Sequence, residues 1–236
     1  MGQYYKGVIF TKSSRKQKNN KIKVCLDNWD YNNGAKLMEH SYVGNSYVRA
    51  YEYLLAERYD GYPFVWVGDY ADEHNGENIY DLAYNFRQER ARRIAKRKGY
   101  VECDGYFRKY DRDGYEIDCK DNFDEVITLD DDVTYKYILN YDKKCFVRIP
   151  KMSEEKDAYG FPKLTIHPLP LLCADGNQRG GGDYYGSNEE LVGLWAYDRI
   201  GIGNEIPSDF KTELIVTFKE KWYEGGKGND YEFRDL

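Results

Sequence analysis

Short runs of apolar and β-branched residues, separated by polar and glycine-containing turns, recur along most of the chain. This pattern predicts β-strands rather than long helices. Two hairpins are indicated by strand pairs that flank Asp111–Gly114 and Tyr141–Lys143. The predicted strands cover residues 4–11, 22–26, 64–67, 106–110, 115–117, 135–140 and 144–149.

Two segments show apolar residues at a spacing of three and four, which is typical of a half-buried helix. The first covers residues 45–58, and the second covers residues 78–98. Gly99 follows the second segment and suits a helix C-cap. We therefore expect two main helices.

The C-terminal third gives weaker signals. Residues 163–172 predict an extended edge strand because prolines interrupt them, and 212–218 predict another strand. Residues 191–202 fit a helix or a strand, and their glycines favour a strand. We expect a frayed tail from residue 225. Together these elements predict an α+β fold with a mostly antiparallel sheet, two main helices and several hairpins.

The strands outnumber the helices and no internal repeat is evident, so we expect one domain over residues 1–236. Residues 75–121 could form a helix-plus-hairpin excursion from it.

Tyrosine reconciles two features of the composition. Mean hydropathy is low, at −0.84, although hydrophobic residues make up 41% of the chain. The chain has 25 tyrosines, and an aromatic content of 17% favours a folded protein over a disordered one. Half-buried tyrosines that cap thin layers are the simpler interpretation, and a tyrosine-rich binding surface is the alternative.

The net charge of −6 argues against nucleic-acid binding over the whole surface. Two segments are nevertheless basic, residues 12–21 and the second half of the second helix. Solvated surface is the favoured interpretation of each. The alternative is nucleic-acid binding through the helix, by Arg87, Arg90, Arg93 and Arg97.

The cysteines and histidines show no metal-ligand spacing. Five widely spaced cysteines indicate reduced thiols in a cytosolic protein, and no HxxxH or HxH pattern supports zinc. There is no apolar signal region and no run that approaches the length of a membrane span. We expect no metal, no cofactor and no membrane partner.

The glycine-rich stretch 173–186 is the leading candidate site. Backbone N–H groups in such a loop can cradle a phosphate, and an arginine can add a bidentate contact. However, neither a P-loop nor a GxGxxG spacing is present, and tight packing against Trp195 is an equal alternative. The candidate ligand-binding residues of the stretch are Asp175, Asn177, Arg179, Gly180, Gly181, Gly182, Asp183 and Tyr184.

Three further residues complete the candidate site. Asp69 and Asp72 follow an apolar strand, where ligand-binding loops are common, although turn chemistry explains them more simply. With another aspartate of the loop they could hold Mg²⁺. His167 lies next to the loop in sequence and is the best placed of the three histidines. No serine or cysteine nucleophile lies in a recognisable motif.

Several phrases together resemble a family of uncharacterised proteins from phages, prophages and gut Firmicutes. They are Met1-Gly-Gln-Tyr-Tyr-Lys6, Lys36-Leu-Met-Glu-His-Ser-Tyr42, Trp66-Val-Gly-Asp-Tyr-Ala-Asp72, Tyr137-Ile-Leu-Asn140 and His167-Pro-Leu-Pro-Leu-Leu172 with the glycine loop. The resemblance spans most of the chain and implies a mobile-element protein in the cytoplasm of a bacterial host. It implies no catalytic residues.

We therefore expect a binding protein without catalysis, an inhibitor or adaptor of a bacterial protein such as a defence-system component. The first alternative is a protein that binds or hydrolyses a nucleotide or another phosphate ligand through the glycine loop. The second alternative is nucleic-acid binding through the basic helix.

Overall fold

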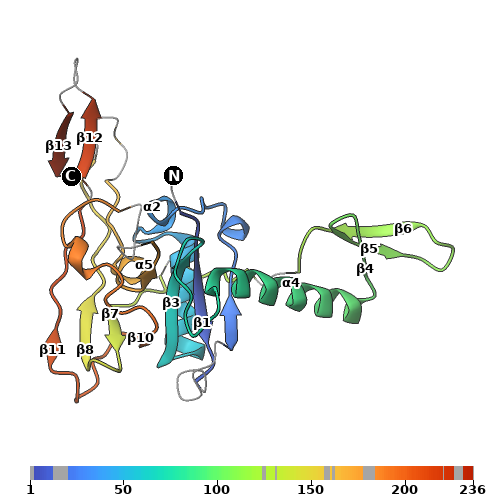
Figure 1. Ribbon diagram of the computed structural model, residues 1–236, viewed down its shortest axis with the longest axis horizontal. Helices are drawn as coiled ribbons and strands as arrows, with labels where there is room; N and C mark the ends of the chain where they lie inside the picture. Colours follow the sequence, from blue (N-terminus) through green and yellow to red (C-terminus); the bar gives the residue numbers. More distant parts are fainter. Residues whose placement is uncertain are drawn as a thin grey trace.

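The computed structural model shows a sheet-centred body from which one long helix projects, with a small sheet at the helix's far end (Figure 1). It describes residues 3–12, 21–123, 126–130, 132–156, 160, 163–177 and 184–219, and the backbone of strands 221–225 and 231–235.

Eight strands of the described residues form the main sheet, in the order β11-β8-β7-β10-β3-β1-β2 with β9 paired to β3. The β3–β9 and β8–β11 pairs are parallel, and the other pairs are antiparallel. The predicted α+β class with a mostly antiparallel sheet is confirmed. The strands are β1 (Tyr5–Phe10), β2 (Ile22–Cys25), β3 (Tyr62–Gly68), β7 (Tyr137–Asn140), β8 (Cys145–Arg148), β9 (Ala174–Asp175), β10 (Arg199–Gly203) and β11 (Thr212–Glu213).

The central strands β1 and β3 are buried on both faces. Alternate side chains of a strand point to opposite faces. Phe64 and Trp66 accordingly pack in the core cluster that holds helix α3 (Ser46–Tyr53). Val65 and Val67 pack in a second cluster with the start of helix α4 (Ile79–Lys98). Burial on both faces explains why β3 is continuously apolar.

Helix α3 continues directly into the π-helical turn η2 (Leu54–Arg58), so the first predicted helix is confirmed over 46–58. The shorter helices cover the same face of the sheet or its edges. They are η1 (Asn28–Tyr31), α2 (Leu37–His40), α5 (Pro168–Leu172) and η3 (Glu189–Leu191). Among the described residues, no helix combines the length and apolar character needed to cross a membrane.

The second predicted helix, α4, leaves the body halfway along its length (Figure 1). Ile79 and Ala83 in its first half pack on the sheet, whereas Ala91 and Ala95 in its second half pack on Phe107. Phe107 belongs to a three-stranded sheet of β4 (Val101–Cys103), β5 (Tyr106–Tyr110) and β6 (Glu116–Lys120). We call residues 88–123, which comprise the second half of α4 and this small sheet, the arm.

The structure corrects four predictions in the C-terminal third. Residues 163–172 are not an edge strand, because 168–172 form the buried helix α5. Only residues 199–202 of the predicted strand 191–202 are in a strand, β10, which ends at Gly203, and only residues 212–213 of the predicted strand 212–218 are in one. The tail from residue 225 contains strand β13 (Tyr231–Asp235), which pairs with β12 (Lys221–Gly225).

Candidate functional site

Asp69, Asp72 and Asp175, three of the predicted site residues, lie at one edge of the sheet. Strands β3 and β9 are parallel, with Val67 opposite Asp175. The residues that follow β3 and the end of β9 are therefore neighbours, as expected of the carboxyl ends of parallel strands. The negative charge of Asp72 acts on the carboxyl of Asp175. The Asp69 carboxylate accepts a hydrogen bond of 3.1 Å from the Tyr4 backbone N–H, which ties it to β1.

Asp175 has two aromatic neighbours that are not among the predicted site residues. The Tyr197 hydroxyl donates a hydrogen bond of 2.5 Å to Oδ2 of Asp175. The His74 ring stacks on the Tyr197 ring with centroids 3.9 Å apart and planes within 5° of parallel. We call Asp72, His74, Asp175 and Tyr197 the Asp175 cluster.

Burial governs the protonation of this cluster. It raises the pKa of Asp175, an effect opposed by the Tyr197 hydrogen bond and the nearby His74 and reinforced by Asp72. Burial also lowers the pKa of His74, against the attraction of Asp175. It raises the pKa of Tyr197, and the Asp175 charge raises it further. An uncharged imidazole beside two carboxylates suits a cationic or hydrogen-bond-donating group better than a phosphate.

Sequence reasoning had one signal for His74 and none for Tyr197. His74 lies five residues after Asp69 in the loop that follows β3, so the loop could have drawn attention to it. Tyr197 lies in a stretch predicted as a strand. Instead, its backbone adopts the left-handed region with a φ of 65°, and its N–H donates to the carbonyl of Phe64 at 2.8 Å. A non-glycine residue rarely adopts this conformation outside a constrained site.

The start of the glycine loop is packed against the first strand. Gln3 donates from Nε2 to the side-chain oxygen of Asn177, and the Asn177 N–H donates to Oε1 of Gln3 at 3.3 Å. A Cβ on Gly176 would collide with the Tyr5 hydroxyl and with Gln3. Close packing therefore favours glycine here, although against Gln3 and Tyr5 rather than against the predicted Trp195. The loop residues Arg179, Gly180, Gly181, Gly182 and Asp183 lie outside the described residues.

Tyr184 and His167 form hydrogen bonds in other parts of the protein and not with the Asp175 cluster. The buried Tyr184 donates from its hydroxyl to the Ser187 carbonyl at 2.7 Å. His167 caps α5 by accepting a hydrogen bond of 3.1 Å from the Leu169 N–H at Nδ1. Its Nε2 lies 3.0 Å from Oε1 of Glu52, so it donates there. The structure does not bring His167 to the other candidates.

A metal site finds no support in the part of the chain that the structure describes. No group of three or more His, Cys, Asp or Glu side chains there could hold a metal ion. Asp69 and Asp72 are thus not completed by Asp175 into a set of metal ligands.

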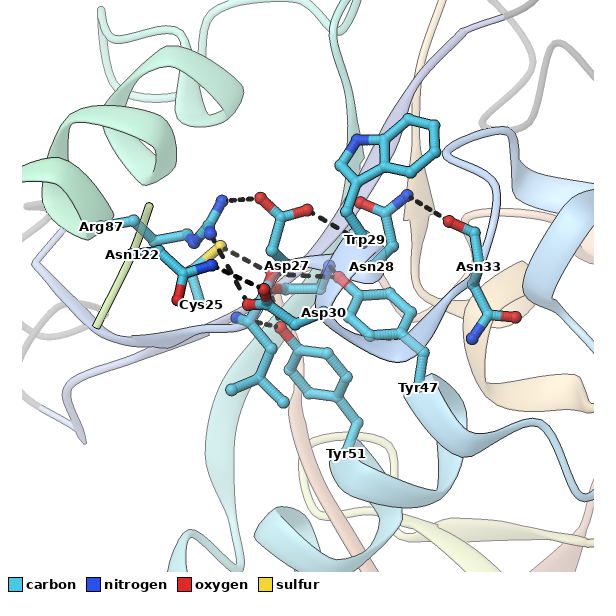
Figure 2. Close-up of polar contacts among 12 residues, drawn as sticks. Cys25, Asp27, Asn28, Trp29, Asp30, Asn33, Tyr47, Tyr51, Arg87 and Asn122 are labelled. Carbon is cyan, nitrogen blue, oxygen red and sulfur yellow. Dashed lines mark hydrogen bonds and ion pairs between the residues drawn. The ribbon is translucent and has the colours of Figure 1, made fainter. Parts of the chain in front are cut away.

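Arg87, the first of the predicted nucleic-acid contacts, is not available to a nucleic acid. Its side chain is buried at the base of the arm and pairs with Asp27, and Asp30 lies 3.9 Å from its second guanidinium nitrogen. Asn122 donates to the Asp30 carboxylate at 2.9 Å from the other end of the arm. Figure 2 shows these side chains converging on the turn after β2. Arg87 therefore joins the arm to the body.

The remaining predicted cations, Arg90, Arg93 and Arg97, follow one stripe of α4. Together with Ile94 and Lys96 they line an open hollow of about 580 Å³. Arg93, Lys96 and Arg97 are exposed. The other cations of the helix are engaged elsewhere, since Arg92 pairs with Glu102 at 2.8 Å and Lys98 lies over the Phe123 ring.

The small sheet of the arm turns to solvent one face that carries apolar side chains together with the Arg108–Glu116 ion pair. Its register places Val101 beside Arg108 and Cys119, and Cys103 beside Tyr106. Phe107 points the other way, to the helix. The apolar side chains of the outer face are strongly exposed, at 60% for Val101, 48% for Tyr106, 42% for Tyr110 and 58% for Ile117. We call this face the outer face of the arm.

Comparison with known proteins adds no relative. No protein-family model matches the chain, and neither a curated protein nor a solved structure matches it.

Proposed function

We propose that this chain is a binding protein that docks on another protein through the outer face of its arm. The exposed apolar surface of the small sheet is the observation that supports this proposal. The face displays Val101, Tyr106, Tyr110 and Ile117 at the end of a helix that carries them away from the body (Figure 1). Aromatic residues are enriched in protein interfaces, and contiguous exposed apolar patches are uncommon on isolated proteins.

The construction of the arm also supports binding. A three-stranded sheet has little core of its own, and this one rests on two alanines of α4. A sheet held outside the body in this way adds little to the stability of the body. Its long reach and exposed tyrosines suit contact with a surface that the body itself does not touch.

The resemblance to phage and prophage proteins gives the proposal its setting. In that setting the chain acts in the cytoplasm of a bacterial host as an inhibitor or adaptor of a host protein, such as a component of a defence system. The absence of a recognisable nucleophile or metal-ligand motif in the sequence favours binding over catalysis.

The test is capture of a host protein by the purified chain and by two matched variants. Tyr106→Ser/Tyr110→Ser removes two tyrosines from the outer face. Tyr70→Ser/Tyr185→Ser removes two tyrosines of the body that are 52% and 62% exposed. We expect the wild type and the Tyr70→Ser/Tyr185→Ser variant to capture a host protein in stoichiometric amount. The Tyr106→Ser/Tyr110→Ser variant should lose this capture while its free energy of unfolding stays unchanged. Equal capture by all three would refute the outer face as the docking surface.

A second candidate function is ligand binding at the Asp175 cluster. The grouping of Asp72, Asp175 and Tyr197 at the ends of β3 and β9 favours it, and the carboxylates favour a cationic or hydrogen-bond-donating ligand over a phosphate. The test is thermal unfolding with nucleotides, divalent metals and the polyamine spermidine, on wild type and Tyr197→Phe. A compound that raises the melting temperature of the wild type more than that of the variant supports a ligand site here. If no compound changes the melting temperature of the wild type, this candidate function is refuted.

A further inference from the structure

We propose that the face of α4 that carries Arg90, Arg93 and Arg97 forms a groove, and that this groove binds an acidic, extended segment of the partner protein. The inference rests on the proposed function, since it takes the partner to be a protein. It concerns a surface separate from the outer face of the arm, and it assigns the chemistry of the partner segment.

Two hollows lie end to end along the helix because they share Arg90. The inner hollow, of about 220 Å³, is bounded by β2, η2 and α4, with Lys23 and Arg58 in its wall. The outer hollow, of about 580 Å³, follows the projecting half of α4. The groove thus runs from the edge strand of the main sheet out along the arm.

Charge sets this groove apart in an acidic protein. Its described lining residues include six cations and no carboxylate: Lys23, Arg58, Arg90, Arg93, Lys96 and Arg97. Arg93, Lys96 and Arg97 are exposed, and their stripe continues the one that contacts the sheet nearer the body. The net charge of the whole chain is −6, so this concentration of positive charge is local. Charge complementarity therefore calls for an acidic occupant.

One segment of the chain itself borders the inner hollow. Residues 126–130 return from the arm to the body without helix or strand, and Ile127 lines the inner hollow. The Ile127 N–H donates to the Tyr31 hydroxyl at 2.9 Å, and the Asp130 carbonyl accepts from Arg49 at 2.6 Å. The segment belongs to an acidic stretch that includes Asp121, Asp130 and Asp132. The contact of this segment with the inner hollow is apolar, through Ile127, and no carboxylate of the described residues lines that hollow.

The floor of the groove favours such a peptide over a nucleic acid. Phe86 and Leu54 lie in the inner hollow and Ile94 in the outer one, so apolar side chains alternate with the cations. Apolar side chains of a peptide can pack there, whereas a phosphate backbone gains nothing from them. The acidic body also repels a long polyanion, but tolerates a short acidic segment confined to the basic groove.

Fluorescence anisotropy with a labelled synthetic peptide of alternating glutamate and leucine tests the assignment. The comparison probes are the same peptide with lysine for glutamate, and a single-stranded oligonucleotide of similar charge. Arg93→Glu/Arg97→Glu reverses two exposed charges of the groove, and Arg93→Gln/Arg97→Gln removes them. Lys151→Glu/Lys211→Glu makes the same charge change at exposed lysines outside the arm.

We expect salt-sensitive binding of the acidic peptide, weakened about tenfold or more by the Arg93→Glu/Arg97→Glu change and less by the glutamine pair. The lysine pair should bind as the wild type does, and circular dichroism should show α4 intact in each variant. Tighter binding of the oligonucleotide, or equal loss with the lysine pair, overturns the proposal. Host-protein capture that depends on Tyr106 and Tyr110 but not on Arg93 and Arg97 would refute the groove and leave the proposed function standing.

Discussion

Gly7 and Leu26 face each other where the ladder between β1 and β2 ends, and two tyrosine hydroxyls lie between them. The Tyr47 hydroxyl accepts from the Gly7 N–H and donates to the Leu26 carbonyl, each at 3.3 Å. The Tyr51 hydroxyl accepts from the Leu26 N–H at 2.9 Å and donates to the Gly7 carbonyl. Figure 2 shows both rings reaching this point from α3. The hydroxyls thus replace the missing strand-to-strand hydrogen bonds of a buried backbone pair.

Gly7→Ala should destabilise the protein because this arrangement leaves no room for a side chain. A Cβ on Gly7 would lie 2.6 Å from Cζ of the fully buried Tyr51. The ring cannot retreat without giving up both hydrogen bonds. We expect a loss of about 1 to 3 kcal/mol in the free energy of unfolding, measured with urea. Gly203→Ala is the control, since its Cβ would meet only the Glu205 carbonyl, 3.9 Å away. An equal effect of the two substitutions contradicts the argument.

His40 should make stability rise with pH between about 4 and 6.5. Its Nδ1 donates to the Gly34 carbonyl at 3.0 Å, and its Nε2 accepts from the Trp66 indole at 2.8 Å. Burial lowers its pKa from 6.5 to about 4, against smaller upward effects of Gly34 and Glu39. Between about pH 4 and 6.5, His40 therefore binds a proton in the unfolded chain but not in the folded chain. The contribution of His40 to the free energy of unfolding is fully present above pH 6.5 and has fallen by about 2 kcal/mol at pH 5.

His40→Gln isolates that contribution. Glutamine can donate to the Gly34 carbonyl and accept from Trp66, but it does not titrate. The difference in unfolding free energy between wild type and variant should narrow as pH falls from 7 to 5. If the unfolding free energies of wild type and variant change with pH in parallel, His40 does not cause the loss of stability at acidic pH.

At the scale of the element, the arm should loosen on its own when its small core is damaged. Phe107 packs on Ala91 and Ala95, with Tyr100 and Phe123 at the margin. Phe107→Ala should therefore speed hydrogen exchange across β4, β5 and β6 while β1 and β3 keep their protection. Tyr115→Ala, at a side chain that is 73% exposed, is the control and should change neither. Loss of protection in β1 and β3 as well would show that arm and body unfold together.

Sequence patterns predicted the elements whose contacts are local and failed where distant contacts decide. The first strands, both main helices and two hairpins follow from periodicity and turn residues, and the structure confirms them. Helix α5 was missed because its prolines suggested a strand edge. They lie in the first turn, where no backbone donor is needed, and core burial decides the rest.

The candidate site was predictable to the same extent. Asp72 and Asp175 lie near each other because the residues after β3 are next to the end of β9, and their role in binding a ligand stays a prediction. Tyr197 and His74 were missed because the parallel pairing of β9 with β3 brings them together, and a strand of two residues leaves no pattern in the sequence. The burial of Arg87 was likewise invisible, since its partners are 57 and 60 residues away.

At the scale of the whole molecule, the position of the arm depends on the junction of Arg87 with Asp27 and Asp30. The Arg87 and Asp27 side chains are 9% and 14% exposed. Replacing Arg87 by leucine would leave the aspartate charge desolvated, which should lower the unfolding free energy by about 2 to 4 kcal/mol. Arg92→Leu is the matched control. It breaks a pair whose side chains are 54% and 42% exposed, and should cost about 0.5 kcal/mol or less.

The same variant should also change where the arm points. In a Cys103→Ser background, Cys119 is the remaining exposed thiol and can carry one spin label, with the second at Ile215→Cys in the body. Arg87→Leu should broaden the distance distribution between the labels, and Arg92→Leu should leave it narrow. Adding Asp27→Asn to Arg87→Leu removes the stranded charge and should recover stability without narrowing the distribution. This separation would show that the ion pair orients the arm as well as stabilising the fold, whereas a narrow distribution in Arg87→Leu would mean that packing alone holds the arm in place.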